Sequence, residues 1–210
     1  MSKFDLTLYL VTDSSGFTQE DFLLKVEQAL QGGVTLVQLR EKEIDGLAYY
    51  QLAQKVKEIT DKYNVPLLID DRIDIVMAVD AAGVHVGQSD VPVQVARKLL
   101  GSDKIVGATA KTVEQALTAE AAGADYLGVG AIYPTTTKVK TVLTSVEMLQ
   151  AICTKVNIPV VAIGGLKYDN IDILKDGKAA GIAVVSAIMQ SNDVIGETKR
   201  LKEKILDYVN

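Results

Sequence analysis

Short apolar runs rich in β-branched residues recur eight times along the chain, and most are followed by a stretch with helical periodicity. The predicted strands are Leu6–Val11, Val34–Leu39, Val65–Ile69, Val84–Val86, Ile105–Ala108, Tyr126–Ile132, Ile158–Ile163 and Ile182–Val185. The clearest helices are predicted at Glu20–Gln31, Gly46–Tyr63, Val113–Ala122, Ser145–Val156 and Val194–Val209. Strands that alternate with helices pair in parallel through crossovers. Eight such units, with strands apolar on both faces, predict an α/β fold, a closed (β/α)8 TIM barrel.

An open, doubly wound sheet is the alternative arrangement of the same elements. Such a sheet normally binds a dinucleotide through a glycine fingerprint after its first strand. Here the first strand is followed by Thr12–Gly16 (TDSSG), which lacks that pattern. The length of 210 residues suits a minimal barrel with short loops, so we expect residues 1–210 to form a single domain.

The charge balance limits the ligands that a chain like this can hold. A net charge of −5 and a pI near 5.0 argue against a nucleic-acid partner, so any anionic ligand needs locally placed cations. The single cysteine, Cys153, cannot form an intramolecular disulfide, and no Cys/His spacing typical of a metal site occurs. No signal peptide or long apolar run is evident. We expect a cytoplasmic protein with no membrane partner, and the sequence leaves a homo-oligomer open.

The stretch Gly128–Lys138 (GVGAIYPTTTK) carries the most concentrated chemistry in the sequence. An apolar strand stops at Pro134, which cannot donate to a sheet ladder, and Thr135–Thr137 and Lys138 follow at once. A parallel sheet presents its site at the carboxyl ends of its strands, so these hydroxyls and this cation are candidates for ligand binding. A solvated polar turn is the alternative interpretation.

The second predicted strand ends in a basic segment. Side chains alternate along a strand, so Gln38, Arg40 and Lys42 share one face while Leu39 points the other way. Two cations and an amide on one face, directed toward the mouth of the barrel, indicate an anion clamp. The alternative is a polar strand end whose charges reach water.

Carboxylates follow the third and fourth strands. Asp70 and Asp71 end one strand, and Asp90 closes the next one. Carboxylates at neighbouring strand ends can share a hard cation such as Mg²⁺, which keeps waters and takes further ligands from a phosphate. Alternatively, Asp90 caps the helix that is expected to begin near Pro92.

The last two strands end in features suited to a phosphate group. Gly164 and Gly165 allow backbone N–H groups to approach a ligand, and a helix is expected to start near Ser186. TIM barrels commonly bind phosphate with these two loops. The only histidine, His85, is interpreted as a hydrogen-bonded interior residue rather than a catalytic one, and Cys153 as a helix-packing residue.

Seven segments in this order resemble the thiamine-phosphate synthase family, from about Leu8 to Met189. They are LYLVTD, VQLREK, the DDR after LLI, GVHVGQSDVP, GADYLGVGAIYPTTTK, IPVVAIGG and VVSAI. The resemblance implies a Mg²⁺-dependent transferase. It would join 4-amino-2-methyl-5-hydroxymethylpyrimidine diphosphate to 4-methyl-5-hydroxyethylthiazole phosphate, releasing diphosphate and giving thiamine phosphate.

The resemblance also implies a role for particular residues. The pyrimidine diphosphate site falls on Gln38, Leu39, Arg40, Glu41, Lys42, Asp70, Thr109 and Lys138. The thiazole phosphate site falls on Thr135, Thr136, Thr137, Gly165, Val185 and Ser186. The metal ligands fall on Asp71 and Asp90, and the catalytic roles on Arg40, Lys42, Thr109 and Lys138.

The chain departs from the family pattern at three positions. Asp70 stands where the family usually has Asn, Thr109 where it has Ser, and Lys111 where it has His. Two other functions therefore stay open: a thiazole tautomerase-like paralogue, and a barrel that binds a phosphorylated ligand without catalysis. The basic segment, both metal aspartates and the TTTK run favour the synthase.

Overall fold

The computed structural model describes residues 4–135, 142–175 and 178–209. Eight parallel strands form a closed barrel in chain order, with the last strand paired to the first. The strands are β1 (Leu8–Val11), β2 (Leu36–Leu39), β3 (Leu67–Asp70), β4 (Gly83–Val86), β5 (Ile105–Ala110), β6 (Tyr126–Val129), β7 (Val160–Ile163) and β8 (Gly181–Val184). The predicted (β/α)8 barrel is confirmed.

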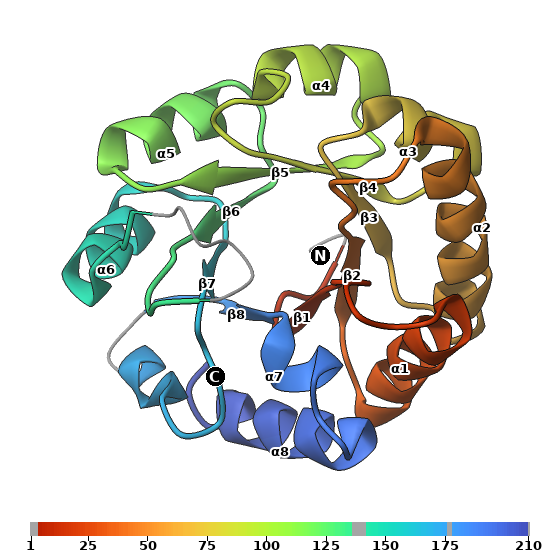
Figure 1. Cartoon of the computed structure of the whole chain (residues 1–210). Helices are drawn as coiled ribbons and strands as arrows, with labels where there is room; N and C mark the ends of the chain where they lie inside the picture. Colours follow the sequence, from red (N-terminus) through yellow and green to blue (C-terminus); the bar gives the residue numbers. More distant parts are fainter. Residues whose placement is uncertain (1–3, 136–141, 176–177, 210) are drawn as a thin grey trace.

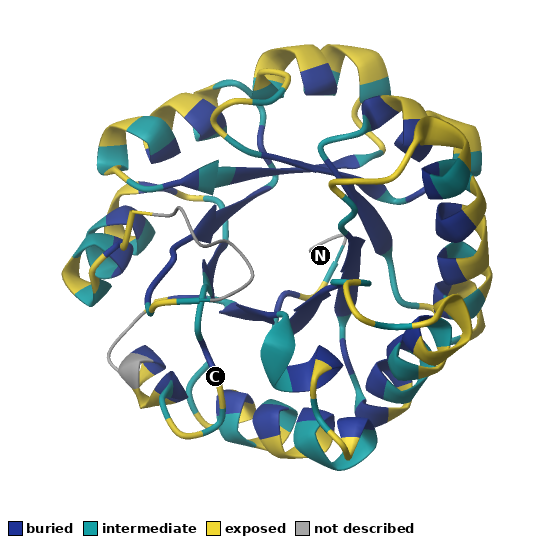
Figure 2. Cartoon of the chain, viewed as in Figure 1, coloured by how far each residue is buried: buried dark blue, intermediate teal, exposed yellow. Residues whose placement is uncertain are grey.

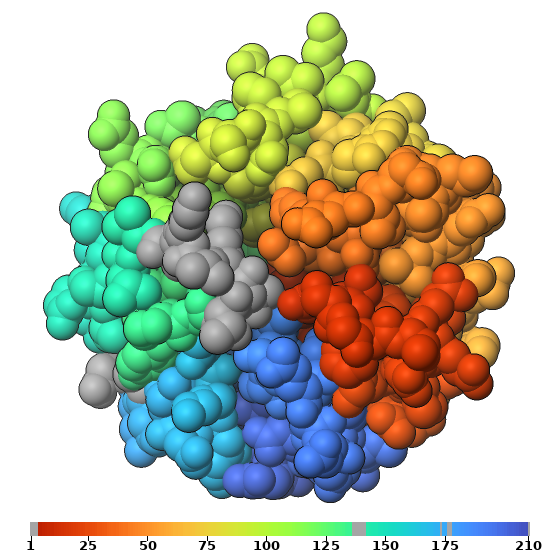
Figure 3. Space-filling view, in the orientation of Figure 1, coloured from red at the N-terminus to blue at the C-terminus, as the bar shows by residue number. Residues whose placement is uncertain are grey.

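Helices surround the strands on the outside, as Figure 1 shows in a view along the barrel. They are α1 (Gln19–Gly32), α2 (Gly46–Lys62), α3 (Ile73–Val79), α4 (Val93–Leu100), α5 (Val113–Ala121), α6 (Val146–Lys155), α7 (Ser186–Met189) and α8 (Val194–Leu206), with a 3₁₀ turn, η1 (Ile171–Leu174). The N-terminal and C-terminal segments lie side by side where the ring closes (Figure 3).

The strands are buried on both faces, as expected for a parallel barrel. One apolar cluster lies between the strands and the helices and contains Leu10, Val37, Ile69 and Leu127. A second, smaller cluster fills the inside of the barrel, and Tyr9 and Tyr126 belong to it. Figure 2 shows the resulting pattern, with buried strands and with helices exposed on their outer faces. The two clusters follow from side chains that alternate along each strand.

Among the strands, the largest difference from the predicted boundaries is at β6, which was expected to reach Ile132 and ends at Val129. Beyond it the chain crosses the end of β7, where the Ile132 amide donates to the Ile163 carbonyl at 3.0 Å. Gly130 permits this crossing, because a Cβ there would lie 1.9 Å from the Ile163 carbonyl oxygen. Pro134 and Thr135 therefore lie at the carboxyl ends of the strands, next to the mouth of the barrel.

Side-chain caps define the start of several helices. Thr18, Asp45, Thr112, Ser145 and Asp193 each accept a hydrogen bond from a backbone N–H in the first turn of the following helix. Such caps satisfy amides that have no partner within the helix. Within the described residues, no helix combines the length and apolar character that a membrane crossing requires.

Arg97 on α4 ties together the end of the barrel opposite the mouth. Its guanidinium donates to the carbonyl oxygens of Gly101, Lys104 and Gly123 at 2.7–3.0 Å and pairs with Asp125. These acceptors lie just before β5 and β6, so one side chain fixes the entry of both strands.

We expect Arg97→Met to lower the free energy of unfolding by about 3 kcal/mol, because it leaves several partly buried acceptors without donors. Urea denaturation measures this loss. Lys98→Met, an exposed neighbour on the same helix, is the matched control and should change stability little. A loss in Arg97→Met no larger than in Lys98→Met would contradict the role of Arg97.

Candidate active site at the barrel mouth

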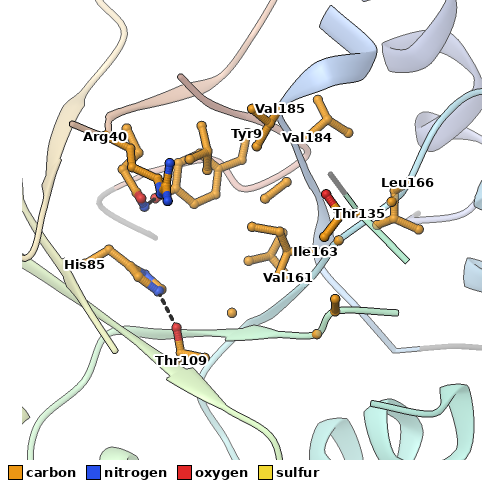
Figure 4. Close-up of a pocket in the computed structure, with 18 of the residues that line it drawn as sticks. Tyr9, Arg40, His85, Thr109, Thr135, Val161, Ile163, Leu166, Val184 and Val185 are labelled. Atoms are coloured by element: carbon orange, nitrogen blue, oxygen red, sulfur yellow. Dashed lines mark hydrogen bonds between the residues drawn. The ribbon is translucent and has the colours of Figure 1, made fainter. Parts of the chain in front are cut away.

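A cavity of about 160 Å³ lies inside the barrel at the carboxyl ends of the strands. One wall comes from β2, β3 and β5 and includes Gln38, Arg40, Asp70 and Thr109. The facing wall comes from the segments after β6, β7 and β8 and includes Thr135, Gly165, Val185 and Ser186. Arg40 and Thr135 lie on opposite sides of this space in Figure 4. The structure thus brings together residues that the sequence placed at separate strand ends.

The basic segment after β2 has the predicted alternation. Gln38 is buried inside the barrel with 4% of its surface exposed, and Arg40 also lines the cavity. Leu39 is fully buried against the helix layer, so its side chain does not line the cavity. Glu41 is held by the Ser14 hydroxyl, which donates to its Oε2 at 2.8 Å, and burial raises the pKa of Glu41.

Asp70 lies within the clamp rather than away from it. Its Oδ2 is 2.6 Å from Lys42 Nζ and 3.9 Å from Arg40 Nε, and only 8% of the residue is exposed. Arg72, which is two residues from Asp70 in the sequence, pairs with Asp74 and not with Asp70. Burial alone would lower the pKa of Lys42, but its contacts with Asp70 and Asp71 outweigh this effect and raise it. The Lys42 ammonium group therefore stays charged beside Asp70, which lines the cavity, although Lys42 itself does not.

Asp71 and Asp90 form a carboxylate pair beside this clamp. Burial, the charge of Asp70 and a hydrogen bond with Asp90 raise the pKa of Asp71 to about 6, although Lys42 acts against them. Asp90 Oδ2 accepts from the Gly87 amide at 2.8 Å. The N-cap of α4 is Pro92, so the alternative role of Asp90 as the helix cap is wrong.

The facing wall has a backbone that only glycine permits easily. Gly165 has a φ of +66°, and a Cβ there would lie 2.7 Å from the Pro134 carbonyl oxygen. Ser186 begins α7 directly after β8, as the sequence predicted. Amides and hydroxyls at these positions suit a phosphate group. Thr136, Thr137 and Lys138, which the sequence assigned to the site, lie outside the described residues.

Comparison with known proteins agrees with this geometry. The family model for thiamine monophosphate synthase matches residues 8–188. The chain is 55% identical over 205 residues to thiamine-phosphate synthase 2 of Streptococcus pneumoniae, with 98% of each chain covered. It is 51% identical over 205 residues to thiamine-phosphate synthase of Lacticaseibacillus paracasei, covering 98% of this chain and 96% of that one.

The chain belongs to the thiamine monophosphate synthase family. A solved structure of thiamine phosphate pyrophosphorylase from Pyrococcus furiosus shares its fold with a TM-score of 0.88 and 36% identity, and 98% of each chain is covered. Membership in this family places the chain among the transferases of thiamine biosynthesis.

Within this family fold, the cavity is also lined by residues that were not among the predicted site residues. Tyr9 lines the cavity, and its hydroxyl meets that of the fully buried Tyr126 at 2.8 Å. Lys111 reaches across the mouth, where its Nζ donates to the Val142 carbonyl at 3.2 Å. Alternation along the first and sixth strands was the available signal for both tyrosines. An inward tyrosine, however, is not distinguished by sequence from one packed in the core.

Two residues have the structural roles that the sequence suggested. His85 is buried inside the barrel, and its ring nitrogens meet Tyr126 and Thr109. Cys153 on α6 packs against the outer apolar cluster and does not line the cavity.

The position of Asp70 predicts its effect on anion binding. Asp70→Asn should improve the affinity for inorganic diphosphate about tenfold, because it removes a negative charge next to two cations at the clamp. Isothermal titration calorimetry measures this change. Asp74→Asn carries the same charge change at an exposed pair and serves as the control. Unchanged affinity in Asp70→Asn would mean that Asp70 does not oppose the anion.

Burial also sets the reactivity of Cys153. Burial raises the pKa of the thiol to about 11 from its usual value near 9, so the folded protein holds about a hundredfold less thiolate at pH 8. Alkylation by iodoacetamide at pH 8 should therefore be correspondingly slow in the folded chain and fast in urea. Equal rates in the two states would contradict the inertness of this thiol.

Proposed function

We propose that this chain couples 4-amino-2-methyl-5-hydroxymethylpyrimidine diphosphate with 4-methyl-5-hydroxyethylthiazole phosphate, releasing diphosphate and giving thiamine phosphate. Relatives named thiamine-phosphate synthase, about half identical over nearly the whole chain, support this reaction. The observation that carries the assignment to these residues is one cavity with two facing polar walls. A cationic wall suits a diphosphate, and a glycine-and-hydroxyl wall suits a monophosphate.

Arg40 and Lys42 are the proposed clamp for the departing diphosphate. Both cations come from one strand end and lie beside Asp70, which keeps them together at the rim of the cavity. Lys138 stays a predicted third cation of this clamp. For Leu39 and Glu41, contact with the pyrimidine diphosphate stays a prediction. Their side chains do not line the cavity. The Leu39 side chain faces the helices, which leaves only its backbone for a ligand contact.

Asp71 and Asp90 are the proposed ligands of Mg²⁺. Two carboxylates close enough to share a hydrogen bond, with the pKa of one raised by burial and by Asp70, fit a site for a hard cation. No group of three metal-ligating side chains occurs within the residues that the structure describes. Water and diphosphate oxygens would complete the shell, as Mg²⁺ prefers. The bound ion would neutralise charge on the diphosphate.

The chemistry requires no nucleophilic side chain. The bond between the pyrimidine methylene carbon and the diphosphate oxygen breaks, and its electron pair leaves with the diphosphate. The thiazole nitrogen then uses its lone pair to form the new bond to that carbon. Arg40 and Lys42 stabilise the negative charge that develops on the leaving group. Thr109, which lines the same cavity from β5, is placed to hold the pyrimidine ring.

The thiazole phosphate is proposed to bind the facing wall. Thr135, Gly165, Val185 and Ser186 line the cavity there. Thr136 and Thr137 stay predictions for the same site. With its phosphate on this wall, the thiazole ring would extend across the cavity toward the clamp, where the diphosphate departs. Two phosphate-bearing substrates thus meet over the middle of one cavity, an arrangement that lowers the entropy cost of their reaction.

The test is an assay of diphosphate release with both substrates and Mg²⁺. Asp71→Asn should reduce the rate about 10²–10³-fold, the cost typical of a lost charge-stabilising group, and excess EDTA should stop the wild-type reaction. Calorimetry with Mg²⁺ and inorganic diphosphate should show weaker metal binding in Asp71→Asn, while thiazole phosphate still binds. Asp80→Asn, at an exposed ion pair, is the charge-matched control.

Each outcome discriminates between the candidate functions. Binding of thiazole phosphate without diphosphate release would favour the tautomerase-like or non-catalytic alternatives. Full activity of the wild type in excess EDTA would rule out the metal site at Asp71 and Asp90.

A further inference from the structure

A string of buried hydrogen bonds crosses the inside of the barrel and connects the two polar side chains at its ends. The Gln38 amide donates to the Tyr9 hydroxyl, which lies 2.8 Å from the Tyr126 hydroxyl. The Tyr126 hydroxyl is 2.8 Å from His85 Nδ1, and His85 Nε2 is 2.9 Å from Thr109 Oγ1. Figure 4 shows His85 directed at Thr109.

The barrel is built to accommodate this string. His85, Gly107 and Tyr126 are register partners on three neighbouring strands. A Cβ at Gly107 would lie 2.2 Å from ring atoms of Tyr126, so the ring crosses β5 only because Gly107 has no side chain. Gly128 gives similar room to the His85 ring, whose Cε1 would be 3.2 Å from a Cβ there.

Such a string lowers the stability of the folded protein unless every polar group in it has a hydrogen-bond partner. TIM-barrel interiors are usually filled by branched apolar side chains, and a buried hydroxyl without a partner is destabilising. Tyr9 and Tyr126 are each at most 1% exposed. Gln38 and Thr109, the two ends, both line the cavity, whereas Tyr126 does not. The string therefore links two ligand-facing groups through a residue that no ligand reaches.

The hydrogen bonds along the string are directional, so the two ends are coupled. If the Gln38 amide nitrogen donates to Tyr9, each hydroxyl donates onward, His85 Nε2 donates to Thr109, and the Thr109 hydroxyl is free to donate to a ligand. If Thr109 donates to His85, every bond reverses. The Gln38 oxygen then accepts from Tyr9, its amide nitrogen faces the cavity, and Thr109 accepts from a ligand.

We propose that this string, held together by Tyr126 as a positioning residue, makes the cavity select a ring that presents a hydrogen-bond donor at one end and an acceptor at the other. An aminopyrimidine meets this requirement, because its amino group donates and its ring nitrogen accepts. A ring that replaces the amino group with an oxo group presents an acceptor to Thr109 instead. In the oxo ring the proton lies on N3, so N1, at the other end of the ring, still presents an acceptor to Gln38. The hydrogen bonds of the string then have to reverse for Thr109, while Gln38 still needs them in their first direction. The inference rests on the proposed function and adds the source of its substrate specificity.

Tyr126→Phe tests the proposal, since it keeps the aromatic ring in place and removes only the central link. Calorimetry without the thiazole substrate compares the 4-amino pyrimidine diphosphate with its 4-oxo analogue. The wild type should bind the amino compound at least tenfold more tightly. In Tyr126→Phe the ratio of the two affinities should fall about tenfold, which corresponds to the free energy of about one hydrogen bond. The fall should arise chiefly because the oxo compound binds more tightly than it does to the wild type.

Tyr49→Phe is the matched control. Tyr49 is equally buried, but its hydroxyl donates to the Leu39 carbonyl at 2.8 Å outside the string. Tyr49→Phe should lose stability as Tyr126→Phe does, but it should keep the wild-type ratio of affinities for the amino and oxo compounds. Equal weakening of both ligands in Tyr126→Phe, or an unchanged ratio, would overturn the proposal.

A measurement on the wild type supplies an independent test. His85 is the only histidine in the chain, so its imidazole ¹⁵N signals need no assignment. The amino ligand should hold His85 as the Nδ1–H tautomer, because Thr109 then donates to Nε2, and the oxo ligand should give the Nε2–H tautomer. The same tautomer with both ligands would overturn the coupling. Failure of the wild type to bind either pyrimidine diphosphate would instead contradict the proposed function.

Discussion

Closure of the parallel sheet is the constraint on which the other features depend. Each strand has both faces covered, and the pairing of β8 with β1 leaves no open edge. Closure also brings eight carboxyl strand ends to the same rim. Segments as distant in sequence as Arg40 and Ser186 thereby line one cavity. Because the fold fixes this rim, the chemistry needs only short loops.

The distribution of charge at the rim explains how an acidic protein can hold anionic substrates. The chain has a net charge of −5, yet Arg40 and Lys42 lie together beside the cavity. Asp70 and Asp71 partly neutralise these cations in the free protein. The same carboxylates would otherwise repel a diphosphate. If Asp71 and Asp90 bind a divalent cation as proposed, these carboxylates contribute to diphosphate binding through the metal, and Arg40 and Lys42 contribute directly.

The interior of this barrel combines close packing with a connected set of hydrogen bonds. Tyr9 and Tyr126 fill space in the inner cluster, and their hydroxyls also bond to each other. Gly107 provides the gap that permits this arrangement. When every group in a buried network is paired, its hydrogen bonds keep a fixed position and direction. Mobile water molecules in the same space would not fix them. The polar surface of the cavity is thus set by residues beneath it.

The sequence alone determined the barrel, because eight apolar runs alternating with helices leave few other ways to bury both faces of each strand. It also determined that Gln38 and Arg40 face one way and Leu39 the other, since side-chain alternation is a local property. Only the tertiary structure decided which partners these residues meet. Asp70 pairs with Lys42 rather than Arg72, and Asp90 lies beside Asp71 rather than capping α4. Such contacts depend on the register between neighbouring strands and on the course of the loops, and no pattern within one strand encodes them.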